Sequence, residues 1–289
     1  MTLIVGVHGI AQQNKGPEVL RSEWEPWLRD GASAAGGNIP ARALTCAFYG
    51  KLFRTPGSTR GDEHFRPSDV TPDEAKLLNA LLEAARKTEP DRIPAAGAAL
   101  RASTPGSVQA GLRLLAQSRF FAGVAERGMI GDLKQVRRYI REPDIRNAAR
   151  AAVDAAVTAD TRVIVAHSLG SVVAYEALHF HADNPRWANI LHFVTLGSPL
   201  GIPNVIFDQL VPQPAAGRGV WPKRIAKWTN VSDDGDIVAL VKKLGPLFGG
   251  VLVDSELIDI RIHNGATAHD VKPYLTAAET GAAICHALA

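Results

Sequence analysis

A serine that could act as a nucleophile lies in residues 163–171, where an apolar strand pattern gives way to small-x-Ser-x-Gly and then to a helical pattern. Ser168 is the central residue, and Ala166 and Gly170 are the small residues on either side of it. This spacing is typical of a nucleophile elbow, a sharp strand-to-helix turn that holds the serine hydroxyl clear of the backbone. The alternative is a plain strand–turn–helix in which the serine only caps the helix.

A serine hydroxyl is a weak nucleophile at neutral pH, so it needs a general base, an acid that orients the base, and donors for the oxyanion. Nine histidines compete for the role of base. His269 follows the last strand pattern and precedes a helical pattern, so a loop at the sheet edge could carry its imidazole to the serine. We therefore predict His269 as the base.

Three aspartates, Asp233, Asp234 and Asp236, follow the strand pattern of residues 225–231. Asp236 is the predicted orienting acid, because the apolar residues 237 and 238 could anchor its loop against the sheet. We interpret Asp233 and Asp234 as turn and N-cap residues, since aspartate before glycine is typical of turns. Asp234 remains open as the alternative acid.

The first strand pattern, residues 3–7, ends in His8-Gly9-Ile10. A glycine directly after a strand lets the backbone approach a substrate closely, and the next amide, that of Ile10, could donate to a carbonyl oxygen. The amide of Leu169, the residue after the nucleophile, would be the second donor. These two amides are the predicted oxyanion hole, and a simple turn is the alternative reading of the His-Gly pair.

The elements that must position these residues are six strand patterns, mostly continuous apolar runs of the kind found in strands buried on both faces. Helical patterns lie between most of them, so we predict an α/β fold with a mainly parallel sheet of about six strands flanked by helices. The strand patterns are residues 3–7, 42–48, 162–166, 190–196, 225–231 and 257–262. The helical patterns are residues 18–35, 171–181, 237–244 and 271–288.

This alternation stops between about residues 54 and 156, where the chain reads as consecutive helices. Thr71-Pro72-Asp73-Glu74 is a capping box with proline in the first helical position. Further helices are predicted over residues 104–127, 133–141 and 143–159. We predict an α/β core of residues 1–53 and 143–289 and a helical insertion of residues 54–142. Ligands of open α/β sheets bind outside the carboxyl ends of the strands, so the insertion is a candidate lid or cap.

The composition is that of a soluble α/β enzyme, with 289 residues, 46% hydrophobic and 21% charged, and a formal net charge of +3. Basic residues are spread among acidic ones, so no nucleic-acid partner is predicted, whereas a membrane-surface contact through the basic insertion stays open. No spacing suggests a metal or a cofactor, and we expect neither. Two cysteines, no signal peptide and no apolar run of about 20 residues lead us to expect a cytoplasmic protein.

With these motifs the chain resembles the α/β-hydrolase superfamily, and within it the lipase- and esterase-like members. Three segments carry the resemblance: residues 7–10, residues 166–170 and residues 195–201, which read Val-His-Gly-Ile, Ala-His-Ser-Leu-Gly and Thr-Leu-Gly-Ser-Pro-Leu-Gly. It covers about residues 1–53 and 156–289, and it implies an α/β-hydrolase fold without the first two strands of the family. It also implies Ser168, Asp236 and His269 as a catalytic triad.

The resemblance implies a serine hydrolase that cleaves carboxylic esters of small-molecule or lipid-like substrates through an acyl-enzyme. A serine peptidase or a thioesterase would use the same triad, so both remain alternatives. A third alternative is an interaction protein that keeps the hydrolase fold without turnover, because a fold alone does not prove a function.

Overall fold

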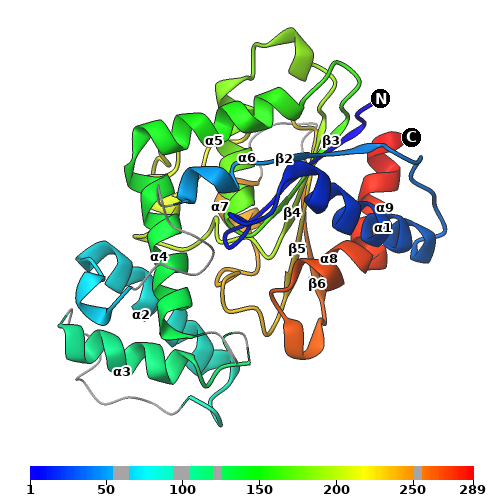
Figure 1. The fold of residues 1–289 in the computed structure, drawn as a ribbon. Helices are drawn as coiled ribbons and strands as arrows, with labels where there is room; N and C mark the ends of the chain where they lie inside the picture. The colour runs from blue at the N-terminus through cyan, green and yellow to red at the C-terminus, as the bar shows by residue number, and fades with distance from the viewer. Residues whose placement is uncertain (55–64, 94–103, 120, 122–124, 250–255) are drawn as a thin grey trace.

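The computed structural model describes residues 1–54, 65–93, 104–119, 121, 125–249 and 256–289. In these residues six parallel strands form one sheet in the order β2-β1-β3-β4-β5-β6 (Figure 1). The predicted α/β fold with a parallel sheet is therefore confirmed. The strands are β1 (Ile4–Val7), β2 (Leu44–Ala47), β3 (Val163–His167), β4 (His192–Leu196), β5 (Lys227–Asp233) and β6 (Glu256–Ile262).

Helices cover both faces of the sheet, which is why the apolar runs of β1 and β3 are fully buried (Figure 1). One apolar cluster joins the sheet to α1, α8 and α9, and a second joins the opposite face to α5 and α6. The helices of the two faces are α1 (Pro17–Ala34), α5 (Pro143–Ala156), α6 (Leu169–Phe180), α8 (Val271–Thr276) and α9 (Ala278–Leu288).

Three further helices, α2 (Pro72–Thr88), α3 (Pro105–Leu115) and α4 (Glu126–Arg141), pack on one another beside the sheet (Figure 1). They enclose an apolar cluster of their own, which also takes in Ile237 from the loop after β5. The predicted capping box opens α2: the Thr71 amide donates to Glu74 Oε2 at 2.8 Å. Of the predicted insertion, residues 55–64, 94–103, 120 and 122–124 lie outside the described residues.

The structure also contains shorter elements. They are α7 (Gly245–Phe248) and the 3-10 turns Gly50–Phe53, Pro67–Asp69, Pro185–Trp187, Phe207–Gln209 and Gly265–Thr267. None of the helices in the described part of the chain is long and apolar enough to cross a membrane. Both cysteines are free thiols.

The helix predicted over residues 237–244 is wrong, because the structure has an irregular loop there. Side chains form hydrogen bonds with backbone groups that would otherwise pair with one another in a helix. Asp236 Oδ1 accepts from the amides of Val238 and Ala239, and the Lys242 carbonyl accepts from Asn230 and Ser232. Competition of this kind from polar side chains favours loops over helices.

The helix predicted over residues 133–141 begins earlier, at Glu126, and two other predicted helices are broken or shorter than predicted. The pattern over residues 271–288 is broken at Ala277, whose extended backbone separates α8 from α9. The pattern over residues 104–127 holds only as far as Leu115, after which the chain turns and the Ser118 hydroxyl donates to the Leu115 carbonyl. In both regions apolar spacing continued across a break in the backbone, which is why the sequence did not reveal it.

Candidate active site

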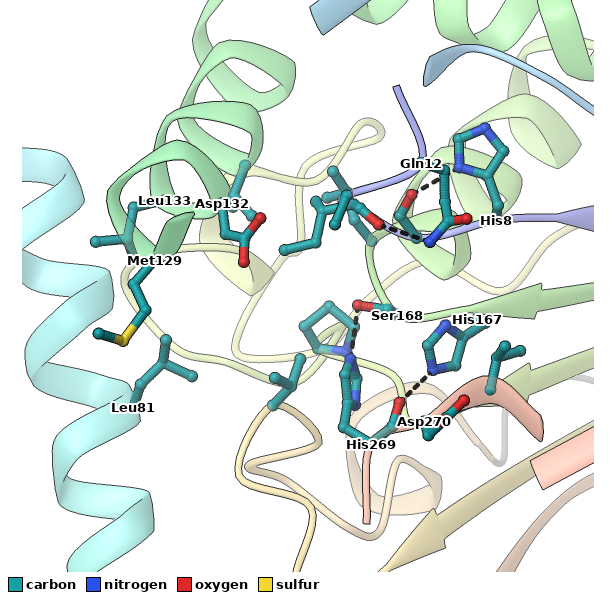
Figure 2. A pocket seen from close by; sticks show the side chains of 18 of the residues that line it. His8, Gln12, Leu81, Met129, Asp132, Leu133, His167, Ser168, His269 and Asp270 are labelled. Carbon is teal, nitrogen blue, oxygen red and sulfur yellow. Dashed lines mark hydrogen bonds between the residues drawn. The ribbon is translucent and has the colours of Figure 1, made fainter. Parts of the chain in front are cut away.

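The candidate site lies where the order of the strands reverses. The chain passes from β1 outward to β2 and then returns to β3 on the other side of β1. Such a switch point leaves a crevice at the carboxyl ends of the strands, where ligands of open α/β sheets bind. Ser168 directly follows β3 and the His8-Gly9-Ile10 turn directly follows β1, so both lie at this crevice (Figure 2).

The backbone at Ser168 has the conformation that a nucleophile elbow requires, with φ 53° and ψ −133°. A positive φ is strained for a residue with a Cβ atom, and such strain is kept mainly at functional positions. The elbow also presses against the end of β1. A Cβ atom on Gly170 would lie 2.3 Å from the Val7 carbonyl oxygen, and one on Gly9 would lie 2.7 Å from Ser168 Cβ. Only glycine fits at these two positions.

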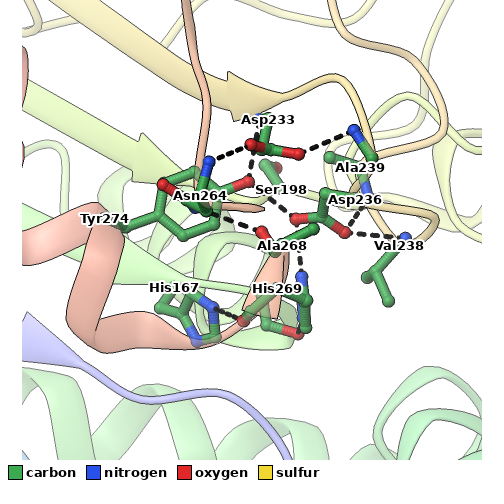
Figure 3. A network of polar contacts seen from close by, with 12 residues as sticks. His167, Ser198, Asp233, Asp236, Val238, Ala239, Asn264, Ala268, His269 and Tyr274 are labelled. Carbon is green, nitrogen blue, oxygen red and sulfur yellow. Dashed lines mark hydrogen bonds and ion pairs between the residues drawn. The ribbon is translucent and has the colours of Figure 1, made fainter. Parts of the chain in front are cut away.

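The structure brings Ser168, His269 and Asp236 together in one hydrogen-bonded chain. Ser168 Oγ lies 2.9 Å from His269 Nε2, and His269 Nδ1 lies 2.7 Å from Asp236 Oδ2 (Figures 2 and 3). All three residues are buried. In this arrangement Nδ1 carries the proton donated to the carboxylate, which leaves Nε2 free to accept the serine proton.

Besides His269, three other groups donate hydrogen bonds to the Asp236 carboxylate (Figure 3). Tyr274 donates its hydroxyl to Asp236 Oδ2 at 2.8 Å, and the amides of Val238 and Ala239 donate to Oδ1 at 2.9 and 3.2 Å. Burial by itself raises the pKa of Asp236, but His269, Lys242 and Tyr274 outweigh it and lower the pKa to about 2. The carboxylate is therefore ionised at neutral pH.

The two competing aspartates have other partners. Asp233 accepts from the Gly235 amide at 2.6 Å and from the Asn264 amide, which agrees with its interpretation as a turn residue. The side chain of Asp234 is 66% exposed and pairs with Arg261 at the surface. No helix follows either residue directly, so the N-cap interpretation was wrong. Neither carboxylate contacts His269 in the described hydrogen bonds.

The predicted oxyanion donors, Ile10 and Leu169, line the same cavity as Ser168. Neither amide has a hydrogen-bond acceptor in the described part of the chain, so both are available to a ligand. The turn that carries Ile10 is fixed by His8, whose Nδ1 donates to the Gly9 carbonyl at 2.6 Å and whose Nε2 accepts from the Tyr49 amide. Burial lowers the pKa of His8 to about 4, which keeps the ring neutral and suited to both bonds.

Sequence reasoning missed three positioning residues. His167 Nε2 lies 2.9 Å from the His269 carbonyl oxygen, and burial lowers the pKa of His167 to about 3, so the neutral ring donates and tethers the His269 loop (Figure 3). Tyr274 bridges the Asp233 amide and the Asp236 carboxylate. Gly197, with φ 54°, leaves room for the triad, because a Cβ atom there would lie 2.7 Å from Asp236 Oδ2.

The sequence held a signal for one of these three residues, His167. A histidine at the end of an apolar strand will be buried, and buried polar groups need partners. That signal marks His167 as a structural donor but does not name its acceptor. Tyr274 carried no comparable signal, because its spacing in the helical pattern is that of an ordinary core residue.

A cavity of about 470 Å³ opens onto Ser168 (Figure 2). The helices α2, α3 and α4 supply one wall, which is mainly apolar and includes Leu78, Leu81, Leu112, Met129 and Leu133. The other end lies near α1 and the loop after His269, where the polar Gln12, Lys15, Glu23 and Asp270 stand beside the apolar Trp24, Trp27 and Val271. The nucleophile therefore stands between an apolar arm and a more polar arm.

Comparison with known proteins yields no relative: no family model, no curated protein and no solved structure matches the chain. Within the described residues, no three histidine, cysteine or carboxylate side chains are grouped as metal ligands. The arrangement instead offers a serine next to a base, a base held by an ionised acid, and two amides beside the serine, which are the parts needed for acyl transfer.

Proposed function

We propose that the protein is a serine hydrolase of the α/β-hydrolase superfamily, lipase- or esterase-like, that cleaves carboxylic esters through an acyl-enzyme intermediate. The observation that carries the proposal is the unbroken chain from Ser168 Oγ through His269 to Asp236, with both contacts within hydrogen-bond distance. The strained backbone of Ser168 supports it, since nothing in the packing of a plain turn requires a positive φ there.

In the proposed reaction His269 Nε2 removes the hydroxyl proton as Ser168 Oγ attacks the ester carbonyl carbon. The amides of Ile10 and Leu169 stabilise the negative charge that develops on the carbonyl oxygen. His269 then gives the proton to the leaving alcohol oxygen, and the C–O bond breaks. In the second half-reaction His269 takes a proton from water, which attacks the acyl carbon; the bond to Ser168 Oγ then breaks, His269 returns the proton to Oγ, and the acid is released. Asp236 stabilises the imidazolium in both halves.

The cavity supports an ester substrate with an apolar acyl group. An extended peptide would need backbone donors and acceptors along its binding site, whereas the arm under α2, α3 and α4 is lined by leucine and methionine side chains. The leaving alcohol must lie on the side of His269, which protonates it. The polar arm beside Asp270 meets that requirement, so the acyl chain is assigned to the apolar arm.

Labelling with a fluorophosphonate probe tests the proposal, because the probe reacts only with an activated serine. We expect labelling of the wild type at Ser168, no labelling of Ser168→Ala, and normal labelling of Ser22→Ala, a surface serine in α1. Hydrolysis of p-nitrophenyl esters should be lost in the first variant alone. An unlabelled, folded wild type would support the non-catalytic alternative, and faster turnover of peptides or thioesters than of esters would support the other two.

A further inference from the structure

One face of α4 borders the cavity, and it holds a single acid among apolar residues. Met129, Asp132, Leu133 and Val136 recur at helical spacing and all line the cavity. Figure 2 shows the carboxyl group of Asp132 pointing into the cavity from the helix wall. A leucine at this position would continue the apolar face, so the packing of α4 does not account for an aspartate.

Asp132 has no hydrogen-bond or ion-pair partner in the described part of the chain. Its apolar surroundings therefore disfavour the ionised form, and burial raises the pKa of the carboxyl group to about 7. Asp132 is half-buried, and a carboxyl group largely withdrawn from water without a partner is held at a cost in free energy. The missing partner is then expected in the cavity itself, where a ligand would lie.

We propose that Asp132 binds a cationic group on the acyl part of the substrate, so that the preferred esters carry a positive charge at the far end of an apolar acyl chain. This inference rests on the proposed ester hydrolysis and names its substrate class. A cation at this place would turn an uncompensated carboxylate into an ion pair in a medium of low dielectric constant.

The other charges that line the cavity leave this role to Asp132. Lys15 and Glu23 pair with each other at 2.6 Å and lie in the polar arm. Asp270 caps the start of α8 by accepting from the Lys272 amide at 3.0 Å. A neutral acyl chain would leave the Asp132 carboxyl group unpaired, and an anionic one would be repelled by it. A cation at the end of the acyl chain would pair with the carboxylate and compensate its charge.

A series of matched esters tests the inference. The acyl chains vary in length and end either in trimethylammonium or in tert-butyl, which has the same shape without the charge. We expect wild type to prefer the cationic ester at one chain length, measured as a ratio of kcat/KM values. Asp132→Asn should lower that ratio by about a hundredfold. The control Glu83→Gln removes a charge from the exposed side of α2 and should keep the wild-type ratio.

A binding measurement keeps this inference separate from the proposed chemistry. Hexyltrimethylammonium is titrated by calorimetry into Ser168→Ala and into the double variant with Asp132→Asn. Binding that weakens at least about tenfold in the double variant supports the cation site even if wild type hydrolyses no ester. Equal affinity in the two variants, or equal preference for both ester series in active wild type and Asp132→Asn, overturns the inference and leaves the triad untouched.

Discussion

Replacing Asp236 by asparagine tests the assignment of the acid most sharply, because the change keeps the shape of the side chain. Asp236 Oδ1 accepts from the amides of Val238 and Ala239, so the single oxygen of asparagine must stay at that position. The new NH₂ group then occupies the place of Oδ2, 2.7 Å from His269 Nδ1. Two donors cannot face each other, so Nδ1 must lose its proton and accept.

The tautomer that results carries its proton on Nε2, directed at Ser168 Oγ, and such an imidazole cannot remove the serine proton. The expected loss is about 10⁴-fold in kcat, the size found when a triad acid is replaced in this way in other hydrolases. This corresponds to about 5.5 kcal/mol of transition-state stabilisation. KM should change little, because Asp236 is not among the residues that line the cavity.

The assay is steady-state hydrolysis of a p-nitrophenyl ester, with circular dichroism to show that each variant is folded. Asp234→Asn makes the same chemical change two residues away, at an exposed side chain paired with Arg261, and should stay within about twofold of wild type. Asp233→Asn disturbs a turn and should lower stability more than kcat. If Asp234→Asn were severe and Asp236→Asn mild, the tautomer argument and the assignment of the acid would both be wrong.

Three further outcomes follow from the geometry. Tyr274→Phe removes one donor to Asp236 and leaves the Asp233 amide unpaired, so it should lower kcat by about tenfold and the free energy of unfolding by about 1–3 kcal/mol, measured by turnover and urea titration. Gly197→Ala places a Cβ atom 2.7 Å from Asp236 Oδ2 and should reduce activity much more than far-UV ellipticity; unchanged activity would contradict the crowding argument. Burial lowers the pKa of His8 to about 4 and that of His167 to about 3, so below a pH of about 6.5 these two histidines are protonated in the unfolded chain but not in the folded protein. The free energy of unfolding should therefore fall as the pH drops from about 6.5 toward 4, by about 1.4 kcal/mol per pH unit for each histidine. Urea midpoints that stay constant over that range would show that the two rings are not held neutral.

The strand and elbow motifs could be predicted from the sequence because their signals are local. Buried parallel strands are continuous apolar runs, and all six appeared within about two residues of their predicted limits. The spacing of small residues around Ser168 restricts the turn in a similar way. The helix predicted after Asp236 was wrong because the Asp236 side chain accepts the backbone amides that a helix would pair with its own carbonyls. The spacing of apolar residues carries no information about this competition.

By itself, then, the sequence determined the order of the elements, the serine at the elbow, and the loops after the last two strands that offer an acid and a base. The sequence favoured Asp236 and left Asp234 open; tertiary structure decided between them, because both lie in one short loop and His269 is 33 positions beyond Asp236. It also decided the partners of Tyr274 and the place of Asp132 in the cavity. Contacts between distant segments depend on how the sheet and helices pack in space, and no spacing along the chain encodes that directly.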